Sequence, residues 1–135
     1  MNRVVEALKA HSPFFVATIE GNTPRVRPFS SVTEFEGNLY LCCNNQKEVY
    51  KQLKKNPRLA LCGMSKEGTW LRVSGVAVED DRIEARAAML ADPTGPSMLY
   101  KADDGLFVVF KIEDVRAVRF AFGKEPEVLS EDETS

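Results

Sequence analysis

The sequence has little of what side-chain catalysis usually depends on. Histidine occurs once, as His11, and tryptophan once, as Trp70. His11 stands just before Ser12-Pro13, a pair that ends a helix, so we expect it to be a surface or helix-terminal residue. A catalytic role would need a partner and a pocket, and the sequence offers no Ser-His-Asp or Cys-His arrangement in a suitable context. We therefore predict no catalytic side chain.

The three cysteines, Cys42, Cys43 and Cys62, form no CxxC spacing. Their number is odd, and adjacent residues such as Cys42 and Cys43 rarely pair with each other. A disulfide framework or a structural zinc site is therefore not expected, and we predict no metal site. Instead we interpret the cysteines as buried small hydrophobic residues on strands.

Long apolar runs and a strong net charge are also missing. No run approaches the roughly 20 residues that a membrane-spanning helix needs. The first six residues include Glu6 where a signal peptide would be apolar, so we expect a cytoplasmic protein. The net charge is -2, which predicts no nucleic-acid partner and no membrane partner. Any anion site must then be local.

A chain of 135 residues suits a single domain. Short apolar and β-branched runs, separated by turn signals, predict about six strands with two or three short flanking helices. Tight turns between consecutive strands favour a largely antiparallel sheet. We expect one domain over residues 1–122 and an acidic, flexible tail over residues 123–135.

Within this pattern, residues 14–20 predict the first strand, and residues 25–35 predict a second that contains Pro28. Residues 106–112 and 115–122 predict the last two strands. The segment 69–78 changes its alternation at Ser74-Gly75, which is typical of a β-bulge. Bulges let a sheet curl, so we predict a mainly β (α+β) fold with a small split barrel.

Two helix starts are predicted from capping signals. Asn45 with Glu48 three residues later resembles a capping box, and Asn56-Pro57 would end that helix. Asp81 with Glu84 predicts a second capped helix, whose buried face would consist of Ile83, Ala87 and Leu90.

One local anion site is suggested by two features. Arg25 and Arg27 share one face of the second strand, while Val26 between them would point into the core. Residues 44–47, Asn-Asn-Gln-Lys, stand at a helix start, where unpaired N–H groups and the helix dipole favour an anion. Two alternatives remain open at this point: a solvated pair of arginines and an ordinary helix cap.

Trp70 lies two residues before Arg72 on a predicted strand, so both side chains share a face. A tryptophan there suits stacking against a planar ligand. Packing in the core or at a dimer interface is the alternative that the sequence alone favours.

Three segments resemble a known family in their order and spacing. They are residues 24–29 (PRVRPF), residues 37–42 (GNLYLC) followed by 45–57 (NQKEVYKQLKKNP), and residues 70–75 (WLRVSG). This arrangement is similar to the pyridoxamine 5′-phosphate oxidase-like split-barrel flavoproteins, especially the small branch of the nitroimidazole-resistance reductases. The resemblance covers residues 14–122.

The resemblance implies that flavin mononucleotide (FMN) binds without a covalent bond between two subunits of a homodimer. The residues that it places around the cofactor are Arg25, Val26, Arg27, Pro28, Phe29, Cys43, Asn44, Asn45, Gln46, Lys47 and Trp70. Arg27 and Lys47 carry the charge that a phosphate needs. Asn45 and Gln46 stand where many members have a hydroxyl or a second basic residue.

The resemblance also implies an oxidoreductase that acts on a small molecule, with NADH or NADPH as a candidate electron donor. The chain lacks the Trp and Arg-x-His with which the full-length oxidases hold their substrate, so pyridoxamine phosphate oxidase activity is not expected. A flavin-binding module without turnover is the first alternative. A plain interaction domain, whose arginines meet a protein partner, is the second.

Overall fold

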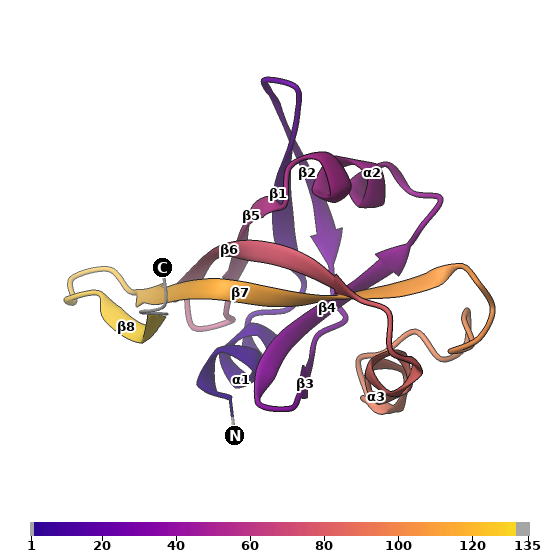
Figure 1. The fold of residues 1–135 in the computed structure, drawn as a ribbon. Helices are drawn as coiled ribbons and strands as arrows, with labels where there is room; N and C mark the ends of the chain where they lie inside the picture. Colours follow the sequence, from indigo (N-terminus) through magenta and orange to yellow (C-terminus); the bar gives the residue numbers. More distant parts are fainter. Residues whose placement is uncertain (1, 132–135) are drawn as a thin grey trace.

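The computed structural model describes residues 2–131 of the chain. These residues form three helices and eight strands (Figure 1). The helices are α1 (Arg3–Ala10), α2 (Glu48–Lys55) and α3 (Ile83–Ala91). The strands are β1 (Phe14–Glu20), β2 (Thr23–Phe29), β3 (Thr33–Phe35), β4 (Asn38–Asn44), β5 (Arg58–Met64), β6 (Trp70–Asp80), β7 (Phe107–Phe120) and β8 (Glu127–Glu131).

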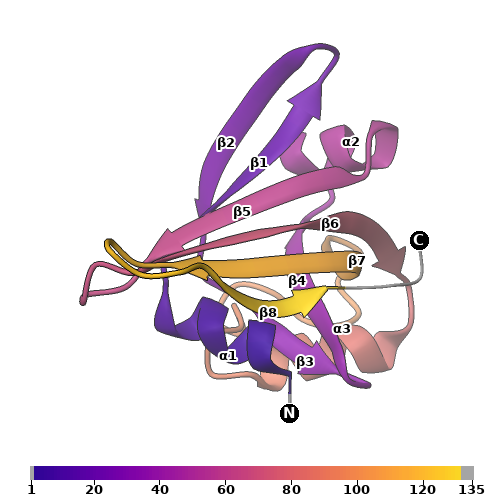
Figure 2. The same ribbon diagram turned by 90° about the vertical axis from the view of Figure 1, so that its left-hand side faces the viewer.

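All strands belong to one antiparallel sheet with the order β2-β1-β5-β6-β7-β4-β3. The long strand β7 pairs with β6 along one edge, and with β4 and then β8 along the other. Figures 1 and 2 show α2 on the same side of β7 as the β1–β2 hairpin, whereas α1 and α3 lie on the opposite side. The predicted mainly β fold of split-barrel type is confirmed, with more strands than expected.

Strand β4 lies next to the edge strand β3 and is buried on both sides. Leu39 and Leu41 enter the main core, whereas Tyr40 and Cys42 enter a second cluster with α3. Both faces of β4 are therefore buried, in agreement with its uninterrupted apolar sequence.

The predicted bulge in β6 is present, because its register against β7 shifts between Ser74 and Val76. A β-carbon on Gly75 would lie 2.5 Å from the Ile112 side chain and 2.9 Å from the Glu113 carbonyl oxygen. Gly75 thus allows the close approach of two strands that the curl of the sheet requires.

Three segments differ from their predicted form. The predicted strand 25–35 is two strands, β2 and β3, separated by residues 30–32. The two predicted final strands are one, because Asp114 continues β7 with φ 52°. The tail was expected to be flexible from residue 123, but residues 127–131 form β8 and bury Leu129 in the core. The rest of the tail, residues 132–135, lies outside the described residues.

The capping predictions were wrong for both helices. Lys47 and Arg82 hold the N-cap positions of α2 and α3, and neither makes a side-chain cap hydrogen bond. Asn45 instead donates to the Gly105 carbonyl oxygen at 2.9 Å. The Asn45 side chain, which the local pattern assigned to a helix cap, makes a tertiary contact instead.

The buried face of α3 was also wrongly predicted. Its buried residues are Ala85 and Met89, whereas Ile83 is half exposed. Arg82 holds the N-cap one residue later than the capping pattern implied, and of the predicted face only Leu90 packs, partly buried, against the second cluster.

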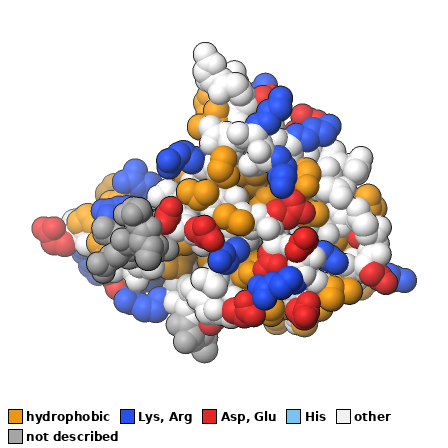
Figure 3. All heavy atoms as spheres, in the orientation of Figure 1, with side chains coloured by type: hydrophobic (Ala, Val, Ile, Leu, Met, Phe, Trp, Pro, Cys, Tyr) orange, Lys and Arg blue, Asp and Glu red, His pale blue; other side chains and the backbone are white. Residues whose placement is uncertain are grey.

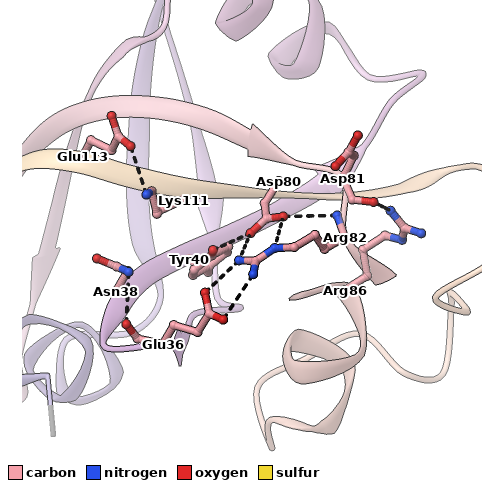
Figure 4. Close-up of polar contacts among 9 residues, drawn as sticks. All are labelled: Glu36, Asn38, Tyr40, Asp80, Asp81, Arg82, Arg86, Lys111 and Glu113. Carbon is pink, nitrogen blue, oxygen red and sulfur yellow. Dashed lines mark hydrogen bonds and ion pairs between the residues drawn. The ribbon is translucent and has the colours of Figure 1, made fainter. Parts of the chain in front are cut away.

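A polar cluster fixes the start of α3 (Figure 4). The Arg82 guanidinium donates to Asp80 at the end of β6 and to Glu36 before β4, with shortest distances of 2.8 Å to each. Tyr40 donates to Asp80 at 2.6 Å. The hydrogen bond from Arg82 holds the pKa of Asp80 well below its usual range, while burial raises the pKa of Tyr40 to about 12.

His11 caps the C-terminal end of α1, as expected of a helix-terminal residue, but it is buried. Its Nδ1 lies 2.7 Å from the Ala7 carbonyl oxygen, and its Nε2 lies 3.0 Å from Thr69 Oγ1. A carbonyl only accepts, so Nδ1 carries the proton and Nε2 accepts from Thr69.

The cysteines divide by environment. Cys42 is buried, as expected, Cys43 is half-buried, and Cys62 is exposed. All three are free thiols. Among residues 2–131, no helix has the length and apolarity to cross a membrane, and no cluster of metal-ligating side chains occurs.

Candidate functional site

A cavity of about 380 Å³ opens where β2, β4, the start of α2 and the loop before β7 meet. Six of the predicted site residues line it, and no Asp or Glu does. These six are Arg27, Pro28, Phe29, Cys43, Asn44 and Lys47. The other lining residues are Ser30, Ser31, Cys42, Val49, Pro96, Leu99, Tyr100 and Phe107.

Arg27 is held in place by a buried network beneath the cavity. Its Nη1 donates to the Val16 carbonyl oxygen at 3.0 Å and to Thr18 Oγ1 at 2.9 Å. Its Nη2 donates to Gln52 Oε1 at 2.7 Å, and Thr18 donates to the same oxygen at 2.6 Å. The guanidinium is thus oriented in advance, which lowers the entropy cost of using its remaining donors.

Lys47 stands at the N-cap of α2 and is exposed. Its backbone N–H donates to the Asn44 carbonyl oxygen at 3.0 Å, which closes a turn over residues 44–47. Its ammonium makes no hydrogen bond or ion pair with any residue in 2–131. A free cation at a helix N-terminus favours an anionic ligand.

The Cys43 thiol lies within the electrostatic reach of both Arg27 and Lys47. Burial raises the pKa of Cys43 to about 12 in spite of these cations. The thiol is therefore neutral near pH 7 and does not cancel the positive charge of the cavity. Burial also lowers the pKa of Arg27, but a guanidinium stays charged at neutral pH.

Tyr100 and Phe107 form an aromatic wall, with ring centroids 5.3 Å apart and an interplanar angle of 27°. Hydrogen bonds fix the chain between Tyr100 and β7. Arg86 of α3 donates to the Ala102 carbonyl oxygen at 2.6 Å, and Asp104 accepts from three backbone N–H groups. The polar cluster at Arg82 therefore supports the cavity indirectly, through α3.

The remaining predicted site residues lie outside this cavity. Arg25 is exposed and pairs with Glu20 at 2.8 Å. Val26 is 67% exposed and does not point into the core as predicted, because β2 lies at the edge of the sheet. Asn45 and Gln46 bond to each other, with Gln46 Nε2 donating to Asn45 Oδ1 at 2.9 Å.

Trp70 lies at the opposite end of the sheet from the cavity. It pairs with Phe120 at one end of β7, whereas Phe107 begins the other end. A strand of 14 residues spans up to roughly 40 Å. Within one chain Trp70 stacks on Phe120 and contacts Phe122, with centroids 5.5 and 5.2 Å apart.

A second hollow, of about 370 Å³, lies on the outer face of the sheet. It is mostly apolar, and Phe15, Val26, Cys62 and Val118 line it together with Arg72 and Arg116. Phe15 and Val26 are exposed in the single chain. On the face drawn in Figure 3, acidic, basic and apolar side chains are intermixed.

Sequence reasoning did not find Tyr100 and Phe107 as site residues, although both lie near the predicted final strands. Gln52 was also missed. The available signal was a glutamine between the apolar residues Val49 and Leu53 on the buried face of α2, since buried polar groups have partners.

The fold and the cavity define a β-rich protein of split-barrel type with a basic, carboxylate-free pocket beside a helix N-terminus. The family model for pyridoxamine 5′-phosphate oxidase matches residues 1–119. A crystal structure of a NimC/NimA family protein from Clostridium acetobutylicum is 39% identical, covers 96% of this chain and 90% of that one, and superposes with a TM-score of 0.91. The chain belongs to the pyridoxamine 5′-phosphate oxidase family, in the branch of the NimC/NimA proteins.

More distant structures share the fold. General Stress Protein 26 from Bacillus anthracis is 15% identical with a TM-score of 0.70, and the alignment covers 93% of this chain and 95% of that one. A pyridoxamine 5′-phosphate oxidase-related, FMN binding protein from Nostoc punctiforme is 16% identical with a TM-score of 0.59, covering 87% and 86%. A search of curated protein sequences finds no match.

Proposed function

We propose that this chain is an FMN-binding flavoprotein and that the cavity beside α2 holds the cofactor's phosphate. The observation that carries the proposal is the placement of Arg27 and Lys47 around the neutral Cys43 thiol, with no carboxylate in the lining. A phosphate monoester needs this combination of fixed and free cations. The FMN binding of the Nostoc relative and the family of the chain support the same cofactor.

The residues of the cavity divide into polar and apolar parts. Arg27, Lys47 and the backbone N–H groups at the start of α2 would hold the phosphate. Pro28, Phe29 and Phe107 offer apolar surface for the rest of the molecule, and a lining of this kind excludes water. Bound flavin would supply electron transfer to and from a small molecule.

A homodimer is part of the proposal. Trp70 reaches the flavin only from a second copy of the chain, because within one chain it lies at the far end of β7. The apolar hollow around Phe15 and Val26 gives that second copy a surface to cover. An apolar hollow with exposed side chains of this size is typical of an interface.

We further propose a cytoplasmic oxidoreductase with NADH or NADPH as electron donor. The cavity contains no His, Asp or Glu to act as a general acid or base, so the reaction would rest on the flavin and on positioning. A non-catalytic flavin-binding module has the same cavity and the same dimer. Turnover alone separates these two functions.

The test is a spectrum of the purified protein followed by an activity assay. An FMN-binding protein is yellow as purified or after addition of FMN, and Lys47→Ala and Arg27→Ala weaken the binding. Oxidation of NADH or NADPH above the rate of free FMN indicates an enzyme, whereas flavin binding without it indicates the module. A protein that stays colourless with added FMN contradicts both and favours an interaction domain.

A further inference from the structure

The hydroxyl of Tyr100 has an oxygen that accepts a hydrogen bond and a proton that remains to be donated. Tyr100 lines the cavity with Arg27 and Lys47, on a loop that sequence reasoning did not assign to the site. We propose that Tyr100 donates a hydrogen bond to the FMN phosphate and is a further determinant of FMN affinity. This inference rests on the proposed function of the same cavity.

The direction of the hydrogen bonds follows from one backbone group. The Gln46 N–H donates to Asn44 Oδ1 at 2.8 Å, and a backbone N–H can only donate. The oxygen of the Asn44 amide is therefore fixed toward Gln46, and its Nδ2 faces Tyr100. That Nδ2 donates to the Tyr100 hydroxyl oxygen at 3.1 Å. The hydroxyl proton of Tyr100 is left for another acceptor.

The lining of the cavity contains no carboxylate to take this proton. Hydrogen bonds in a chain polarise one another, so accepting from Asn44 makes the Tyr100 hydroxyl a better donor. Its ring is held against Phe107, which keeps the hydroxyl in place. A ligand oxygen in the cavity could therefore accept the hydrogen bond that the Tyr100 hydroxyl has left to donate.

The phosphate, rather than the ring of the flavin, is the ligand group nearest to this donor in the proposed site. Asn44, which contacts Tyr100 through its side chain, also accepts from the Lys47 N–H through its carbonyl oxygen. The same turn therefore brings the Tyr100 hydroxyl and the N-terminal end of α2 together. A phosphate that lies against Lys47 lies beside Tyr100.

The experiment compares FMN with riboflavin, which has the same ring and ribityl chain but no phosphate. Each ligand is titrated into the wild type and into Tyr100→Phe, and binding is followed by flavin fluorescence. Loss of one hydrogen bond to a charged group predicts an FMN affinity roughly 10-fold to 100-fold lower for Tyr100→Phe. The riboflavin affinity should change by less than about two-fold.

Tyr50→Phe is the matched control, because its hydroxyl donates to Glu79 at 2.9 Å and lies outside the cavity lining. It should change neither affinity. As a second variant, Asn44→Leu leaves Tyr100 in place but removes the amide that orients it, and it should also weaken FMN more than riboflavin. Melting temperatures confirm that each variant is folded.

The outcomes are distinct. Equal losses for FMN and riboflavin, or no loss for either, would overturn the assignment of Tyr100 to the phosphate. A wild type that binds neither ligand would overturn the proposed function itself, independently of Tyr100.

Discussion

Replacing Gln52 by leucine should destabilise the fold strongly, although the two side chains are similar in size. Gln52 is 5% exposed, and its Oε1 accepts from Thr18 at 2.6 Å and from Arg27 at 2.7 Å. Leucine fills the same space but accepts nothing. The variant therefore leaves two donors beneath the cavity without this partner.

The magnitude follows from the cost of unsatisfied buried donors. Each costs about 1–3 kcal/mol, so Gln52→Leu should lower the free energy of unfolding by about 2–6 kcal/mol. Thr18→Val should cost less, about 1–2 kcal/mol, because Arg27 Nη1 keeps the Val16 carbonyl oxygen as an acceptor. The double variant should cost clearly less than the sum, since the two residues share one network.

Urea unfolding of the wild type, the two single variants and the double variant measures these values. Gln52→Glu is the matched control, because it keeps an oxygen that can accept from both Thr18 and Arg27 and adds an ion pair to Arg27. A cost below about 0.5 kcal/mol for Gln52→Leu, or strict additivity with Thr18→Val, would refute the network as the support of Arg27.

Three further predictions concern the core, the thiols and the interface. Gly63→Ala should cost about 1–3 kcal/mol in unfolding free energy, because its Cβ would clash with the His11 carbonyl oxygen. Ser74→Ala, on the exposed face of β6, should cost under about 0.5 kcal/mol, and equal costs would contradict the packing. Stability should fall as pH rises above about 9, because burial raises the pKa of Cys42 and Cys43 to about 12 in the folded chain while the unfolded thiols titrate near 9.0. The unfolded chain then binds fewer protons than the folded one. Urea unfolding at pH 8 to 11 should show the unfolding free energy falling less steeply with pH in Cys42→Ala than in the wild type. An unfolding free energy of the wild type that stays constant over this pH range would contradict this account. Cys62 is exposed and lines the apolar hollow, so in dilute protein it should react with a maleimide before the other thiols. Its reaction should slow as the protein concentration rises and a dimer covers the hollow. A rate that does not depend on concentration, with a monomer mass by light scattering, would contradict a dimer through the outer face of the sheet.

The elements with strong local signals were predictable from the sequence. The strand 14–20 and the bulge at Ser74 are where the alternation placed them. β2 and β3 are separate strands because they pair with different partners, β1 and β4. The continuity of β7 through Asp114 depends on pairing with β4 and β6, which lie far from it in the sequence, so no local pattern reveals it. The same holds for β8, a short segment between acidic residues that pairs with β7 and also contacts α1.

Only one side of the cavity could be predicted from the sequence, because the other side depends on contacts between distant residues. Arg27, Lys47 and their neighbours carry charge or lie in recognisable turns, so the sequence places them at an anion site. Tyr100 in the loop before β7 and Phe107 at the start of β7 lie more than 50 residues from Asn44, and the pairing of β4 with β7 brings them to it. Val26 was misplaced because alternation alone does not tell which face of an edge strand is buried.

FMN titration of the wild type beside Lys47→Ala and Arg27→Ala tests the central claim most directly. Binding is followed by flavin fluorescence, with riboflavin as the ligand that lacks the phosphate. The account predicts that the wild type binds FMN more tightly than riboflavin, and that each substitution reduces this preference by roughly 10-fold or more. A wild type that does not bind FMN, or variants that keep the full preference for FMN, would contradict it.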